Sequence, residues 1–181
     1  MNNSIRQKIL LLLSAGLSLG FTYSPKKQYK ILKTLSKEWQ KINKENLSKE
    51  IRNLYRSKLI EAKENSDGSF TYVLTDKGKL KALTYHFQNM TIKKNKWDNK
   101  WRVVIFDIPE KLKNSRNALR DKLKKLGFYE FQKSVFVLPW ECKDEINFII
   151  EFFHLRKYVR YGIFNYIDNE LHLKKIFNLL N

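Results

Sequence analysis

A run of four apolar residues, Val103 to Phe106, opens the second half of the chain. β-Branched and aromatic residues in an unbroken run predict a strand that is buried on both faces. Pro109 cannot donate a hydrogen bond to a sheet, so we expect this strand to begin at Trp101 and to end at Ile108.

The rest of the C-terminal half alternates between helical and strand-like patterns. Leucines on one helical face predict a helix that Gly127 ends, and Phe131–Leu138 is the next strand-like run. A second helix, the strand-like run Tyr158–Ile167 and a closing helix follow. With an extra strand or a bend near Ser134, this order predicts an α+β protein with a ferredoxin-like βαββαβ domain and a C-terminal helix. The apolar positions of the three helices are Leu112, Leu119, Leu123 and Leu126, then Ile146, Ile149, Ile150 and Phe153, then Leu173, Ile176, Phe177 and Leu180.

The N-terminal half has the pattern of a small helical module. Its first apolar segment runs from Ile9 to Phe21 and resembles a signal peptide, but it is too short and too interrupted by Ser and Gly to span a bilayer. We interpret it as a core helix. A second helix is expected to start at Ser24 and Pro25, and a third helix to follow the break near Asn43. Their inward positions are Ile31, Leu35, Trp39 and Ile42, then Leu47, Ile51, Leu54 and Tyr55.

A β-hairpin is predicted directly after the third helix. Strand-like residues 59–64 and 70–75 flank a turn-rich segment that contains Asp67-Gly68. The next helix is expected to be capped by Asp76 and to carry Leu80 and Leu83. Three helices, a hairpin and a further helix follow one another in the order of a winged helix-turn-helix, in which the third helix enters the major groove.

The third helix presents a polar face at spacing i, i+3, i+4 and i+7, formed by Lys49, Arg52, Asn53 and Arg56. Cations and an amide are the groups that reach phosphates and base edges from a helix. An ordinary solvated face is the alternative interpretation. The candidate contacts to double-stranded DNA on the third helix and the hairpin are Lys44, Asn46, Ser48, Lys49, Arg52, Asn53, Arg56, Lys63, Asn65, Ser66 and Ser69.

The charge of the chain supports a polyanionic partner. The 36 basic and 18 acidic residues give a net charge of +18. Cys142 is the single cysteine, which argues against a disulfide framework and fits a cytoplasmic protein with no membrane segment. Residues 91–100 have no clear period and place lysines around Trp97. We interpret them as a basic linker that Trp97 anchors to a neighbouring domain, with stacking on a base as the alternative.

Three segments carry a family resemblance. Phe106-Asp107-Ile108-Pro109 and Gln132-Lys133-Ser134-Val135-Phe136-Val137 resemble the central domain of PaaX-like transcriptional repressors and, equally, the related small CRISPR-associated "Cas two" adaptation protein. Leu74-Thr75-Asp76-Lys77-Gly78 is similar to the winged-helix half of the same repressors. The resemblance implies a homodimer that is joined through the ferredoxin-like domains and presents two winged helices to DNA. A single helix follows the last strand here, which puts a small-molecule effector response in doubt.

Asp107 is the candidate catalytic residue. In the adaptation family the aspartate that ends the first strand is a proposed Mg²⁺ ligand, and Glu110 is the only nearby supplement here. A structural role, in which Asp107 caps the following turn, is the interpretation we favour, and we expect no cofactor.

The sequence therefore predicts three segments: a winged helix-turn-helix at 1–90, the basic linker at 91–100 and a ferredoxin-like dimerisation domain at 101–181. The expected function is that of a dimeric, sequence-specific DNA-binding transcriptional regulator, a repressor. A Mg²⁺-dependent nuclease of the adaptation type and a non-catalytic nucleoprotein scaffold are the alternatives.

Overall fold

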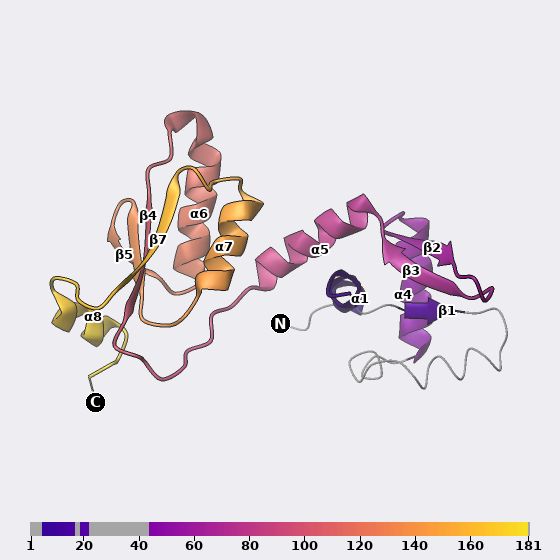
Figure 1. Ribbon diagram of the computed structural model, residues 1–181, viewed down its shortest axis with the longest axis horizontal. Coiled ribbons are helices and arrows are strands. Elements are labelled where there is room, and N and C mark those ends of the chain that lie inside the picture. Colours follow the sequence, from indigo (N-terminus) through magenta and orange to yellow (C-terminus); the bar gives the residue numbers. More distant parts are fainter. Residues whose placement is uncertain (1–4, 17–18, 22–43, 181) are drawn as a thin grey trace. The chain divides into compact units, whose positions relative to one another are not determined.

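The computed structural model describes residues 5–16, 19–21 and 44–180 (Figure 1). The chain divides into two compact units, Met1–Asn89 and Met90–Asn181. The expected second helix, from Ser24 to Ile42, lies outside the described residues. Within the described part, no helix has the length and apolar character needed to cross a bilayer.

The N-terminal unit packs helices against a small sheet. Its elements are α1 (Ile5–Ser14), β1 (Leu19–Phe21), α4 (Lys44–Arg56), β2 (Ile60–Glu64), β3 (Phe70–Leu74) and α5 (Asp76–Asn89). β2 and β3 form the expected antiparallel hairpin, and β1 pairs with the other edge of β3, which gives the sheet order β1-β3-β2.

The core of the N-terminal unit joins its helices to its hairpin. Of the expected inward stripe on α4, Leu47 and Leu54 are buried and Ile51 is half-buried. Tyr55 was wrongly predicted to face inward, since its side chain is 54% exposed and its ring lies 6.5 Å from that of Tyr72. The two rings meet edge to face, so Tyr55 packs on the hairpin rather than in the core. The other buried residues of this core are Ile9, Leu10, Leu59, Ile60 and Ala82.

The start of α5 corrects one prediction. The hydroxyl of Thr75, rather than the carboxylate of Asp76, accepts the hydrogen bond of a free helical amide, that of Gly78 at 3.1 Å. The face that packs inward carries Gly78 and Ala82, while Leu80 and Leu83 are 63% and 45% exposed. The backbone of the hairpin lies so close to the first turn of α5 that a side chain at Gly78 would meet it. This explains why small residues occupy the inner face of the helix.

The C-terminal unit has the predicted βαββαβ order with a closing helix. Its elements are β4 (Trp101–Phe106), a 3₁₀ turn η1 (Glu110–Leu112), α6 (Lys113–Lys125), β5 (Tyr129–Gln132), β6 (Val135–Leu138), α7 (Lys143–Phe152), β7 (Val159–Phe164) and α8 (Glu170–Ile176). All strand pairs are antiparallel, in the order β5-β6-β4-β7. The strands β4 and β5, which α6 joins, lie on either side of β6. The strands β6 and β7, which α7 joins, lie on either side of β4, as in a split βαβ unit.

Each strand-like run of this unit has other boundaries than predicted, and β7 ends at Phe164 rather than at Ile167. β4 ends at Phe106 rather than at Ile108, and the amide of Asp107 makes a last hydrogen bond, of 3.0 Å, to the carbonyl of Tyr158. The run Phe131–Leu138 is two strands rather than one, because a turn at 133–134 separates β5 from β6. The expected bend near Ser134 is therefore the hairpin that supplies the fourth strand.

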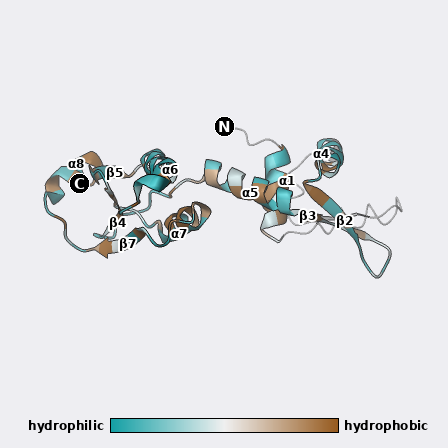
Figure 2. Cartoon of the chain, turned by 90° about the horizontal axis from the view of Figure 1, so that it is seen from above, coloured by the Kyte–Doolittle hydropathy of each residue, from teal (hydrophilic) through white to brown (hydrophobic). Residues whose placement is uncertain are grey.

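The central strand β4 is covered on both faces, as predicted, except at Ile105. Figures 1 and 2 show α6 and α7 on one face of the sheet and α8 on the other. Trp101 and Val103 pack with Leu173 of α8. Phe106 stacks on Phe136, with ring centroids 5.8 Å apart. Ile105 remains 40% exposed.

Candidate nucleic-acid interface

The third helix predicted from the sequence is α4, and its two faces differ as expected. Its apolar side packs into the core of the N-terminal unit, and hydrophilic colour covers much of the rest in Figure 2. Lys44 is its first residue. The other candidate DNA contacts on this helix are all exposed, namely Asn46, Ser48, Lys49, Arg52, Asn53 and Arg56.

The cations of this face are available for a polyanion. Lys49, Arg52 and Arg56 make no ion pair with any side chain that the structure describes, a set that begins at Asn46 in this helix. The Asn53 amide donates a hydrogen bond of 3.3 Å to the Glu50 carboxylate. Glu50 points toward α1 in turn, where its carboxylate lies 3.7 Å from the Arg6 guanidinium. Glu50, one of the two acidic residues of α4, is thereby engaged by Arg6 and Asn53.

Arg6 is a positioning residue that the sequence reasoning missed. Its guanidinium donates a hydrogen bond of 3.1 Å to the Ser57 hydroxyl, which donates to the carbonyls of Asn53 and Leu54 at the end of α4. Arg6 thus joins α1 to α4 at two points, Glu50 and Ser57. The available sequence signal was an arginine just before the apolar run of this helix.

The hairpin tip is organised by its own polar side chains. The Asn65 amide donates to the hydroxyls of Ser69 and Thr71, both at 2.9 Å. The Asp67 carboxylate accepts bonds from the amide and the hydroxyl of Ser69, and Gly68 has a φ of +73°, which a residue without Cβ adopts at no steric cost. Asn65 and Ser69 therefore build the turn, while Ser66 is exposed at its apex.

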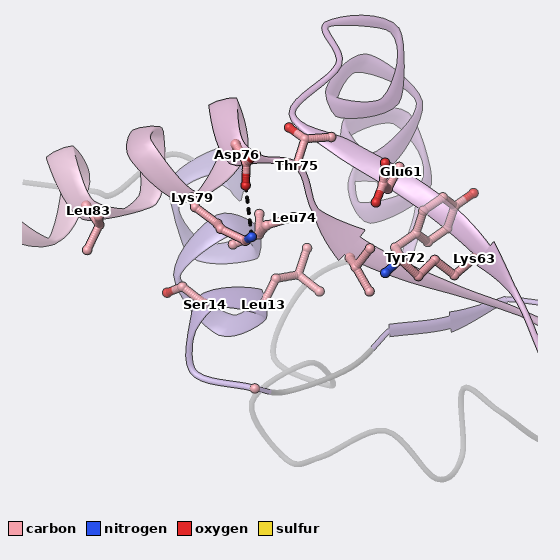
Figure 3. A pocket seen from close by; sticks show the side chains of 12 residues that line it. Leu13, Ser14, Glu61, Lys63, Tyr72, Leu74, Thr75, Asp76, Lys79 and Leu83 are labelled. Carbon is pink, nitrogen blue, oxygen red and sulfur yellow. Dashed lines mark hydrogen bonds and ion pairs between the residues drawn. The ribbon is translucent and has the colours of Figure 1, made fainter.

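Lys63 lies on β2, opposite Thr71 of β3. With Glu61 of β2 and Tyr72 of β3 it lines an open depression that also borders α1 and α5 (Figure 3). An ion pair of 3.0 Å between Asp76 and Lys79 crosses the edge of this depression. The mixture of charges in its wall does not define a ligand class.

In the C-terminal unit, Asp107 stands at the end of β4 with an exposed side chain. The predicted capping role is not seen: the following turn has Pro109 at its N-cap, with no side-chain hydrogen bond. Among the described residues the Asp107 carboxylate has no hydrogen-bond or ion-pair partner. The structure therefore provides no structural bond for this carboxylate.

Glu110, the other carboxylate of this loop, is already engaged. Arg116 donates to it at 2.7 Å, Lys113 lies 3.5 Å away, and Arg116 also donates to the carbonyl of Ile108 at 3.1 Å. The Arg116 hydrogen bond holds the pKa of the Glu110 carboxyl below its ordinary value. No group of three metal-ligating side chains occurs among the described residues. The donor set around Asp107 is thus one carboxylate, which is a poor fit to Mg²⁺ within one copy of the chain.

Comparison with known families identifies the C-terminal unit. Residues 94–173 match a family model described as the PaaX protein central Cas2-like domain, a match that spans β4 to α8 up to Leu173. No curated protein matches the chain. Of the three segments that carried the resemblance, those around Asp107 and around Ser134 lie inside the matched range, and residues 74–78 lie outside it. The match covers 80 of the 181 residues and identifies residues 94–173 as similar to the central Cas2-like domain of PaaX proteins.

Proposed function

We propose that this chain is a dimeric, sequence-specific DNA-binding protein that represses transcription. The family match supports a role in transcription regulation at the level of the family. The net charge of +18 supports a polyanionic partner. The α4 helix is the proposed recognition helix, and the β2–β3 hairpin is the proposed wing.

The observation that carries this proposal is the exposed cationic face of α4. Lys49, Arg52 and Arg56 have no acidic partner among the side chains that the structure describes, and the neighbouring Glu50 carboxylate lies 3.7 Å from the Arg6 guanidinium. Arginine donates two parallel hydrogen bonds to guanine, and an amide such as that of Asn53 bonds the edge of adenine. Lysine contacts to phosphates add affinity that is independent of sequence.

The proposed homodimer rests on the apolar surface of the C-terminal unit. β7 is an edge strand of its sheet, and an exposed edge in a folded protein is normally covered or paired. Large exposed apolar side chains cluster on β7 and the segment after it, namely Ile163, Phe164, Tyr166, Leu171 and Ile176. A two-fold axis there would present two copies of α4 to half-sites about 34–36 Å apart, or to a multiple of that spacing.

Footprinting of the purified protein on the region upstream of its own gene tests this function. We expect protection of a palindromic site, and fluorescence anisotropy should show tighter binding to that site than to a scrambled duplex of equal length. Equal affinity for both duplexes would show that the protein binds DNA without sequence specificity. That result would contradict the proposed repressor function.

A metal-dependent nuclease is the second candidate, and the free carboxylate of Asp107 is the observation that favours it. Two copies of Asp107 facing each other across a dimer axis would supply two carboxylates to one Mg²⁺ ion. The engagement of Glu110 by Arg116 argues against a richer site. The other alternative is a non-catalytic scaffold in a nucleoprotein complex. Such a scaffold would make the same DNA contacts as the nuclease but would not cleave DNA.

A further inference from the structure

The segment that opens the C-terminal unit is held by a buried arginine. The Arg102 side chain is only 5% exposed, and its guanidinium binds Asp98 through two bonds of 2.5 and 2.8 Å and Glu141 through a bond of 2.9 Å. It also donates to the carbonyls of Lys100 and Pro139, at 2.8 and 2.9 Å. These bonds tie residues 98–100 to the loop that follows β6.

The same segment is anchored by aromatic packing. The Trp97 ring lies 4.9 Å from that of Trp101, and its ring N–H donates to the carbonyl of Lys100 at 3.0 Å. The ammonium of Lys174 lies 5.3 Å from the centre of the Trp97 ring. Trp97 is therefore an anchor, as predicted, and its ring is occupied by neighbours of the same unit. Residues 97–100 hold a defined conformation without belonging to a helix or strand.

In this network Asp98 and Glu141 pair with Arg102 rather than with the lysines of the same segment. Hydrogen bonds from Arg102 lower the pKa values of Asp98 and Glu141, so both are ionised at neutral pH, and both are committed to the buried guanidinium. Lys93, Lys96 and Lys100 are exposed and form no ion pair with a described residue. We call these three residues the linker lysines.

We propose that the linker lysines form a second DNA contact, which binds the phosphate backbone of a duplex without regard to its sequence. This inference rests on the proposed DNA-binding function and adds a binding surface to it. Lysine ammoniums are compact point charges suited to phosphates. Lys100 lies in the segment that Arg102 and Trp97 already order, so its backbone loses little entropy on binding. Lys93 follows Asn89, the last residue of the N-terminal unit, by four residues, a chain length of at most about 14 Å.

The salt dependence of DNA binding tests this proposal. The full-length protein and the triple variant Lys93→Gln, Lys96→Gln, Lys100→Gln are titrated onto a duplex of scrambled sequence between about 50 and 200 mM salt. Each phosphate contact contributes roughly 0.9 to the slope of log affinity against log salt concentration. Between these two salt concentrations the affinity of wild type falls by some factor. If three contacts are lost, the corresponding factor for the variant should be roughly 40 times smaller.

A matched variant controls for the general loss of charge. Lys111→Gln, Lys125→Gln, Lys133→Gln removes three exposed lysines of the same unit that also make no ion pair with a described residue. We expect this control to keep the wild-type slope, and circular dichroism should show the same melting curve for all three proteins. An equal change of slope in both triple variants, or in neither, would overturn the linker site and leave the proposed function standing. Absence of DNA binding by wild type at every salt concentration would remove both.

Discussion

The carbonyl oxygen of Leu59 occupies the space where a side chain on Gly78 would start. A Cβ on Gly78 would lie 1.9 Å from that oxygen and 3.2 Å from a methyl of Leu74. The oxygen is held in place, because it accepts a hydrogen bond of 3.2 Å from the amide of Thr75. The Thr75 hydroxyl also donates to the carbonyl of Lys58, at 2.8 Å. The junction between the hairpin and α5 therefore has no room to move away from Gly78.

Gly78→Ala should destabilise the N-terminal unit by about 3 kcal/mol or more, because the new methyl group meets fixed backbone rather than a movable side chain. Urea denaturation followed by circular dichroism measures this loss. Gly68→Ala is the control: its Cβ would meet nothing within 4 Å, and its φ of +73° costs only about 1–2 kcal/mol. Equal effects of the two substitutions would contradict the packing of α5 against β2.

Arg52→Ala and Arg56→Ala should each weaken specific DNA binding by roughly 1–3 kcal/mol, because each removes a bidentate donor from the exposed face of α4. Lys49→Ala should weaken binding to all sequences by similar amounts. Fluorescence anisotropy on the footprinted site and on a scrambled duplex separates these effects. Arg156→Ala, which removes an exposed arginine paired with Glu151 in the other unit, is the control. Wild-type binding by all three α4 variants would exclude this helix as the recognition helix.

Ile163→Glu should convert a dimer into a monomer, because it places a charge on a 50% exposed apolar position of the edge strand β7. Sedimentation equilibrium at micromolar concentration measures the change in mass. Leu80→Glu, at an exposed apolar position of the N-terminal unit, should leave the mass unchanged. A monomeric wild-type protein at this concentration would remove the basis of the proposed interface.

Asp107→Asn should leave DNA affinity near the wild-type value, because the proposed contacts lie in other parts of the chain. Neither protein should cleave DNA or RNA with Mg²⁺ or Mn²⁺, since Arg116 engages the neighbouring Glu110. Gel assays with each metal, and with a chelator as control, test this. Cleavage that requires a divalent metal and disappears in Asp107→Asn would replace the repressor assignment with a nuclease.

Acid should destabilise the C-terminal unit through the Arg102 network. The folded pKa values of Asp98 and Glu141 lie below their unfolded values, near 3.8 and 4.5, because Arg102 donates hydrogen bonds to both carboxylates. Their contribution is therefore fully present above about pH 5 and is lost as the pH falls through the folded pKa values. Urea midpoints measured from pH 7 to pH 3 should decline less steeply in Arg102→Met than in wild type. Parallel pH profiles would show that these carboxylates are not coupled to Arg102.

Local patterns were sufficient for most of the elements. The alternation and apolar runs of the chain predicted β4, α6, α7 and the β2–β3 hairpin, because an element that packs on a core must place its apolar residues at its own period. Asn65, Asp67 and Gly68 marked the turn, since their side chains and backbone freedom act within a few residues. The family resemblance added the identity of the central domain, which the match to residues 94–173 confirms.

Tertiary structure alone decided how side chains distant in sequence share a partner. Arg102 and Glu141 are 39 residues apart, and Arg6 and Ser57 are 51 apart, so no local period links them. The inward prediction for Tyr55 was wrong for a related reason: helical spacing gives a direction, but the neighbouring elements decide how deep each position lies. The sequence by itself determined the elements and the cationic faces, because those depend on near neighbours. The fold decided which charges are paired and which stay free, because pairing depends on distances that only packing sets.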